Sequence, residues 1–128
     1  MNPPMHTRVR NYFVDAGLTN GFITQLLIWK DTGKQTDAIM VFRPNGGTAV
    51  RKGLGSQYFI IVDVVGAKNA DAAVDKAAHA IIDYVQQNPM ADACVGYLEN
   101  LGGIPAPVLT TEGRLVYRIQ FVATFGSS

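Results

Sequence analysis

The most regular pattern in the chain is an alternation of apolar and other residues near its C-terminal end. Every second position from 115 to 125 is apolar, and the alternating positions from 114 to 124 include two arginines, a glutamine and a threonine: Leu115, Tyr117, Ile119, Phe121, Ala123 and Phe125 alternate with Arg114, Val116, Arg118, Gln120, Val122 and Thr124. A period of two is typical of a strand that buries one face. The pattern therefore predicts a half-buried strand over residues 115–125.

A second strand is predicted over Tyr58–Val65, where both alternating sets are apolar. Such a run is typical of a central strand covered on both faces, so we expect Ile61→Asp to unfold the chain. Asp63 interrupts the run, and a buried carboxylate needs hydrogen bonds or a cation. We expect Asp63 to pair with Arg114 or Arg118 on a neighbouring strand rather than to act in catalysis.

Two segments have the period of a helix. The first begins at Pro3-Pro4, ends at Gly17, and has apolar residues at Met5, Val9, Tyr12, Phe13 and Ala16. The second covers residues 70–87 between a capping Asn69 and the stop Asn88-Pro89, with an apolar stripe of Val74, Ala77, Ala78, Ile81, Tyr84 and Val85. Both patterns indicate helices that lie on a sheet.

The remaining segments are shorter. Ile23–Trp29 and Asp37–Phe42 are apolar stretches on either side of turn residues and predict a hairpin, and residues 94–98 predict a short strand. Glycines and a proline over residues 43–57 predict a long mobile loop. The whole chain, 1–128, is therefore expected to be one α+β domain, with a mixed or antiparallel sheet of four to five strands and two α-helices packed on it.

Composition narrows the class of protein. Apolar residues make up 48% of the 128 residues and charged residues 16%, which is typical of a globular chain rather than a disordered one. A net charge of +1 argues against nucleic-acid binding by phosphate neutralisation. The longest apolar run is too short to cross a membrane. A single cysteine and the lack of a signal-peptide pattern indicate synthesis in a reducing cytoplasm.

No pattern of catalytic or metal-ligating residues is present. His6 and His79 are the only histidines, and the spacing of Asp75, His79 and Asp83 is that of ordinary pairs on a helix surface. Cys94 lies between small apolar residues and is expected in the core. No serine lies in a Gly-x-Ser-x-Gly motif. We therefore predict no enzyme activity, no cofactor and no metal.

The glycine-rich segment Asn45–Gly55 is the nearest approach to a phosphate-binding loop. It lacks the order Gly-x-x-x-x-Gly-Lys-Ser/Thr, and a predicted strand rather than a helix follows it. A plain surface loop is the simpler interpretation. If the loop has a function, its basic and polar residues suit contacts with another protein, and the candidate assembly-interface residues are Arg43, Asn45, Arg51 and Lys52.

Several stretches together resemble a known family. These are the helix Pro3–Gly17, the strand Tyr58–Val65, the helix Ala70–Gln87, and the closing stretch from the proline-rich Gly103–Val108 through Glu112-Gly113-Arg114 into the last strand. In this order they are similar to the tail terminator proteins of long-tailed, non-contractile phages and prophages, the lambda-type minor tail protein U group. The phrase Val41–Thr48 also looks prophage-like.

The resemblance implies an α+β fold and a structural function without a cofactor. It implies a homo-oligomeric ring, typically a hexamer, that caps the tail tube of a siphophage or prophage, stops tail polymerisation and presents a surface for head attachment. The implied partners are other copies of the chain, the tail tube protein and the head–tail connector protein. The implied location is the virion tail, after synthesis in the bacterial host cytoplasm.

Three alternatives remain open. Another head–tail joining or neck protein would share the compartment and the assembly. A small ligand-binding regulatory α+β domain would be a monomer or dimer with a defined pocket. An enzyme that uses the glycine-rich loop on a phosphorylated ligand would be stabilised by nucleotides.

Overall fold

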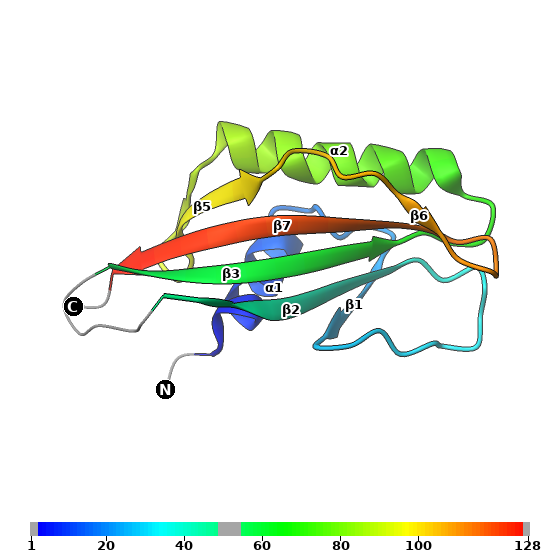
Figure 1. Ribbon diagram of the computed structural model, residues 1–128, viewed down its shortest axis with the longest axis horizontal. Coiled ribbons are helices and arrows are strands. Elements are labelled where there is room, and N and C mark those ends of the chain that lie inside the picture. Colours follow the sequence, from blue (N-terminus) through cyan, green and yellow to red (C-terminus); the bar gives the residue numbers. More distant parts are fainter. Residues whose placement is uncertain (1–2, 49–54, 127–128) are drawn as a thin grey trace.

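The structure is a computed structural model that describes residues 3–48 and 55–126. These residues form two helices and seven strands (Figure 1), in the order α1 (Met5–Asp15), β1 (Ile23–Leu26), β2 (Ile39–Gly47), β3 (Gly55–Val65), α2 (Asp71–Gln87), β4 (Met90–Asp92), β5 (Gly96–Leu101), β6 (Val108–Leu109) and β7 (Leu115–Gly126).

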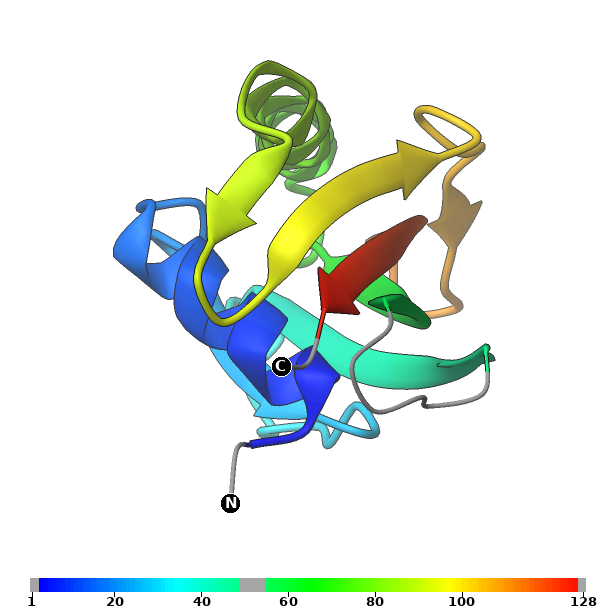
Figure 2. The same cartoon turned by 90° about the vertical axis from the view of Figure 1, so that its left-hand side faces the viewer.

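All seven strands belong to one mixed sheet. Its order is β1-β2-β3-β7-β5-β4, and β6 pairs with the beginning of β7. The two longest strands, β3 and β7, pair antiparallel along their whole length at the centre of the sheet, from Gly55 opposite Gly126 to Val65 opposite Val116. Figure 2, which looks at the molecule from one end, shows that the sheet curls around one side of α1 while α2 lies along its top.

The expected sheet of four to five strands with two helices packed on it is wrong. The sheet has seven strands and is curled into a half-barrel, so the fold is mostly β. Two strands were missed because β4 and β6 are only three and two residues long, too short to show a period. Curling is a property of the whole sheet, and no single stretch of sequence carries it.

The expected hairpin between residues 23–29 and 37–42 is also wrong. β1 and β2 run parallel, with Ile23 opposite Ile39 and Leu26 opposite Phe42. A parallel pair requires the connection to return along the sheet to the start of the first strand. Residues 27–38 make this return, and the turn residues within them, at Asp31–Gly33, fold the connection locally instead of joining two antiparallel strands.

The loop expected over residues 43–57 is shorter at both ends. β2 continues through Pro44 to Gly47, with a register shift between these two residues, and β3 already begins at Gly55. Just beyond β2, the Thr48 amide donates a hydrogen bond of 2.9 Å to the Gln57 carbonyl oxygen. Pro44 is tolerated because the strand is irregular at that point. Residues 49–54 lie outside the described part of the chain.

The main core lies on the inner side of the curled sheet. Phe13 of α1 makes edge-on contacts with Phe42 of β2 and Phe121 of β7, at ring-centroid distances of 5.5 and 5.8 Å. The buried stripe of α2, which completes this core, consists of Val74, Ala78, Ile81, Ile82 and Val85. Both helical periods are thereby confirmed. The predicted cap is wrong, because Ala70 occupies the N-cap position and no side chain caps the helix.

The opposite side of the sheet, named here the outer face, is formed by the residues that alternate with the core positions. Its central members are Arg43, Ile61, Asp63, Arg118 and Gln120. At one end Trp29 covers a second, smaller cluster of buried side chains, Ile39, Val41 and Val65. Neither helix packs on the outer face, since the buried residues of both helices belong to the main core.

Candidate assembly surface

A cluster of charged residues lies at the centre of the outer face. Asp63 of β3 is directly opposite Arg118 of β7, and Arg43 lies on β2, on the other side of β3. Asp63 Oδ2 is 2.9 Å from Arg43 Nη2, and Arg118 Nε donates a 3.1 Å hydrogen bond to Asp63 Oδ1. Of the two arginines predicted as alternative partners of Asp63, Arg118 is the one that pairs with it, while Arg114 bonds to main-chain oxygens elsewhere. The third member, Arg43, was not foreseen.

The cluster has an excess of positive charge. One carboxylate, with 12% of its side chain exposed, faces two guanidinium groups that are 28% (Arg43) and 62% (Arg118) exposed. Arg43 Nε is a buried donor that has no hydrogen-bond acceptor among the described residues. Because two guanidinium groups face one carboxylate, this part of the outer face favours an additional carboxylate or other acceptor.

A groove of about 480 Å³ extends from this cluster along the outer face. Apart from Arg43, Asp63 and Arg118, its lining is apolar: Ile28, Trp29, Val65, Ala106, Val108 and Val116. Two of the lining side chains are largely in solvent, Ile28 at 61% and Val108 at 65% exposed. Leu109, next to Val108, is 63% exposed. Adjacent exposed apolar side chains of this size are typical of surfaces that contact another protein.

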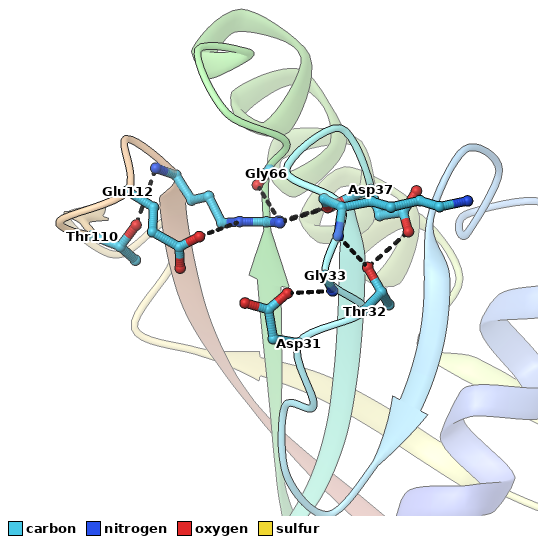
Figure 3. A network of polar contacts seen from close by, with 9 residues as sticks. Asp31, Thr32, Gly33, Asp37, Gly66, Thr110 and Glu112 are labelled. Carbon is cyan, nitrogen blue, oxygen red and sulfur yellow. Dashed lines mark hydrogen bonds and ion pairs between the residues drawn. The ribbon is translucent and has the colours of Figure 1, made fainter.

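One wall of the groove is held in place by Arg114, whose side chain is fully buried. Its Nη1 donates hydrogen bonds to the carbonyl oxygens of Asp37 (2.7 Å) and Gly66 (3.3 Å), and its Nη2 donates to that of Lys34 (2.9 Å). Figure 3 shows Thr110 and Glu112 of the β6–β7 turn on one side of Gly66 and Asp37 of the connection on the other. The guanidinium carbon also lies 5.5 Å from the centre of the Trp29 ring. Arg114 therefore links the connection 27–38 to the sheet.

The connection also folds through its own polar side chains (Figure 3). The Gly33 amide donates a 2.8 Å hydrogen bond to Asp31 Oδ1, and Thr32 Oγ1 donates one of the same length to Asp37 Oδ2. These short-range bonds are typical of Asx and Ser/Thr turns. The position of Trp29 and Ile28 at the groove is thus fixed at both ends of the connection.

Two of the four candidate interface residues lie in the described part of the chain, and they are apart from each other. Arg43 lies in the charged cluster, whereas Asn45 is exposed further along β2. Arg51 and Lys52 lie outside the described residues. Sequence reasoning missed Ile28, Trp29 and Val108. The sequence did carry a signal for these residues. They are large apolar residues directly beside turn-forming residues or prolines, at positions that the buried core of a strand does not need.

The expected position of Cys94 is wrong, because this residue is exposed. It lies in the turn between β4 and β5, where Asp92 Oδ1 accepts hydrogen bonds from the amides of Cys94 and Val95. His79 and Asp75 form the expected i,i+4 pair, at 3.3 Å. Within residues 3–48 and 55–126 no group of three or more metal-ligating side chains is found, and no helix is long and apolar enough to span a membrane.

Comparison with known proteins gives one family. The sequence model of a family described as "Phage tail termination protein" matches residues 2–127. No curated protein matches the chain closely enough to be compared with it.

Proposed function

Because the chain belongs to the phage tail termination protein family, we propose that copies of it assemble into a ring that caps the tail tube and stops its polymerisation. Family membership itself gives the chain a structural role in completing the phage tail and a location in the virion tail. The ring, its hexameric number of copies, and its function as the head-attachment surface are the proposal.

The observation that carries the proposal is the outer face. The inner side of the curled sheet lies against the main core, whereas its other side has a charged cluster with excess positive charge beside an apolar groove. Stable contacts between proteins combine a desolvated apolar patch with a polar rim. The outer face has both parts, and Trp29 and Arg43, whose residue types are enriched in such contacts, line the groove.

Three kinds of partner are proposed: further copies of the chain, the tail tube protein and the head–tail connector protein. Arg43 contributes through the charged cluster, and Asn45 through its exposed side chain near the end of β2. Arg51 and Lys52 belong to the same proposal on the basis of their residue type alone. Synthesis takes place in the cytoplasm of the bacterial host, and no specific nucleic-acid binding is proposed.

The proposal is tested by deleting the gene from its phage or prophage and examining the particles by electron microscopy. A tail terminator is required to stop tube growth, so we expect overlong tails that lack heads. Full heads and finished tails of normal length, found separately, would instead indicate a head–tail joining protein. Complementation with the wild-type chain restores normal tails in the first case, and tail length is the quantity to measure.

A further inference from the structure

The groove on the outer face is lined mostly by apolar side chains. We propose that it receives the exposed side of α2 from a second copy of the chain, with α2 carboxylates against Arg43 and Arg118. This inference rests on the proposed ring and specifies the contact that builds it. It joins two surfaces that lie on opposite sides of the sheet.

Charge is the first argument. The outer-face cluster has two guanidinium groups for one carboxylate and a buried, unaccepted donor at Arg43 Nε among the described residues. α2 has the opposite balance, with three aspartates and a single lysine in its sequence. Asp71 and Asp83 are exposed. Asp75 is engaged, because it accepts a hydrogen bond from Tyr117 and pairs with His79.

Shape is the second argument. The outward side of α2 includes three exposed alanines, Ala72, Ala73 and Ala80. Small side chains allow a helix to approach another surface closely, and the groove offers apolar walls between the exposed Ile28 and Val108. Burial of these two side chains under a helix removes apolar area from water, which is favourable. Asp71 and Asp83 are twelve positions apart on α2, about 18 Å along the helix, so one of them would lie at the polar end of the groove and the other beyond it.

Topology is the third argument. The buried residues of α2 pack with Val62, Val64 and Ile119, which alternate along β3 and β7 with the outer-face residues Asp63 and Arg118. α2 and the groove therefore lie on opposite sides of the same sheet, and they cannot meet within one subunit. A contact between two different patches is heterologous, and repetition of such a contact around an axis closes a ring. A twofold dimer would need one patch to meet itself.

The test uses the purified full chain and measures its mass by native mass spectrometry and sedimentation across a concentration series. Arg118→Asp reverses the charge of the groove, and Asp71→Lys with Asp83→Lys reverses that of α2. Each variant alone should raise the apparent dissociation constant between copies of the chain at least about 30-fold, the effect expected when an interfacial charge pair is lost. Arg10→Asp, on α1 outside both surfaces, is the matched control and should leave the mass unchanged. Circular dichroism verifies that each variant is folded.

The decisive step is to mix the two reversed variants. In the mixture every groove can meet an α2 of opposite charge, so rings should form again although neither variant forms them alone. A mixture that stays monomeric, reversed variants that keep the wild-type mass, or a wild-type chain that stays monomeric at high concentration would overturn the contact.

Tail length after complementation distinguishes a failure of the groove contact from a failure of the proposed tail function. A monomeric chain that still restores normal tails overturns the groove contact and leaves the tail role intact. If Asp71→Lys disturbs the first turn of α2, the single variant Asp83→Lys is used in place of the double variant.

Discussion

Arg114 Nη1 donates a 2.7 Å hydrogen bond to the main-chain oxygen of Asp37, 77 positions earlier in the chain. The same side chain bonds to the oxygens of Lys34 and Gly66, so one guanidinium joins the β1–β2 connection, the end of β3 and the start of β7. A charged group with no exposed surface is tolerated only when such bonds compensate for the loss of water. Arg114 thus organises the fold around the groove.

Replacement of Arg114 by Met should therefore be strongly destabilising. Three carbonyl oxygens would lose a charged donor in a buried site, so we expect the free energy of unfolding to fall by at least about 3 kcal/mol. Urea unfolding monitored by circular dichroism measures this loss of stability. Arg118→Met is the control, because its guanidinium is largely exposed and its removal should cost less than about 1 kcal/mol. Equal losses in the two variants would contradict the assigned role of Arg114.

A second prediction concerns the glycine at the β4–β5 turn. Gly96 has φ +83°, and a Cβ added to it would lie 2.5 Å from the Thr124 carbonyl oxygen of β7. Gly96→Ala should therefore lower the free energy of unfolding by more than about 2 kcal/mol, because conformational strain and a backbone clash act together.

The matched control for Gly96 is Gly102, which has nearly the same φ, +82°, but nothing within 4 Å of an added Cβ. Gly102→Ala should cost only the strain of the left-handed conformation, about 1 kcal/mol. Thermal unfolding of the two variants side by side separates the clash from the strain. The interpretation fails if both lose the same stability.

A third prediction concerns pH. The Tyr117 hydroxyl donates a 2.5 Å hydrogen bond to Asp75 Oδ1. This bond is the largest cause, and burial the second, that raises the pKa of Tyr117 to about 12. Since the folded-state pKa lies above the ordinary value of about 10, the stabilisation is fully present below pH 10 and is lost as the pH rises from 10 to 12. Tyr117→Phe should cost about 2 kcal/mol at neutral pH.

The pH dependence of Tyr117 is measured as a difference. The pKa of Tyr12 is also raised to about 12, chiefly by burial and also by Tyr84, so wild type and Tyr117→Phe both lose stability above pH 10. The gap between their unfolding free energies should nevertheless shrink between pH 10 and pH 12. A gap that stays constant over this range would show that the hydroxyl–carboxylate bond does not contribute.

A fourth prediction separates the two faces of β3. Val62 is fully buried in the main core, so Val62→Asp should place an unpaired charge there and abolish folding. Ile61 lies on the outer face, half-buried and opposite Arg43. Ile61→Asp should therefore cost only about 1 kcal/mol, because the new carboxylate can pair with a cation. Soluble yield and urea unfolding measure both, and an unfolded Ile61→Asp chain would contradict the assignment of the faces.

The half-buried position of Ile61 also shows the limit of the sequence pattern. The apolar run Tyr58–Val65 correctly predicts a central strand, because both alternating sets are apolar. It does not predict which set is covered, since cover on the outer face comes from Trp29 and ends near Val65. The expectation that Ile61→Asp unfolds the chain treated both sets alike. Coverage depends on a connection whose path is fixed by Arg114, far away in the sequence.

The candidate surface was predictable in part. The burial of Asp63 in an apolar run required a cation, and an arginine on the neighbouring strand was the correct choice. Arg43 was selected for its place in a glycine-rich segment, yet its position beside Asp63 follows from the extension of β2 into that segment. The groove itself could not be predicted, because its walls come from residues 28–29 and 106–108, which only the curled sheet brings together.

The order in which the strands are made has a consequence for synthesis. β7 leaves the ribosome after the other six described strands, yet it lies between β3 and β5 at the middle of the sheet. Until it emerges, the nascent chain holds two separate sheet fragments with unpaired edges, and the β1–β2 connection lacks its buried anchor. A chain that stops before residue 115 would therefore form no smaller version of the fold, so assembly is restricted to chains that include β7.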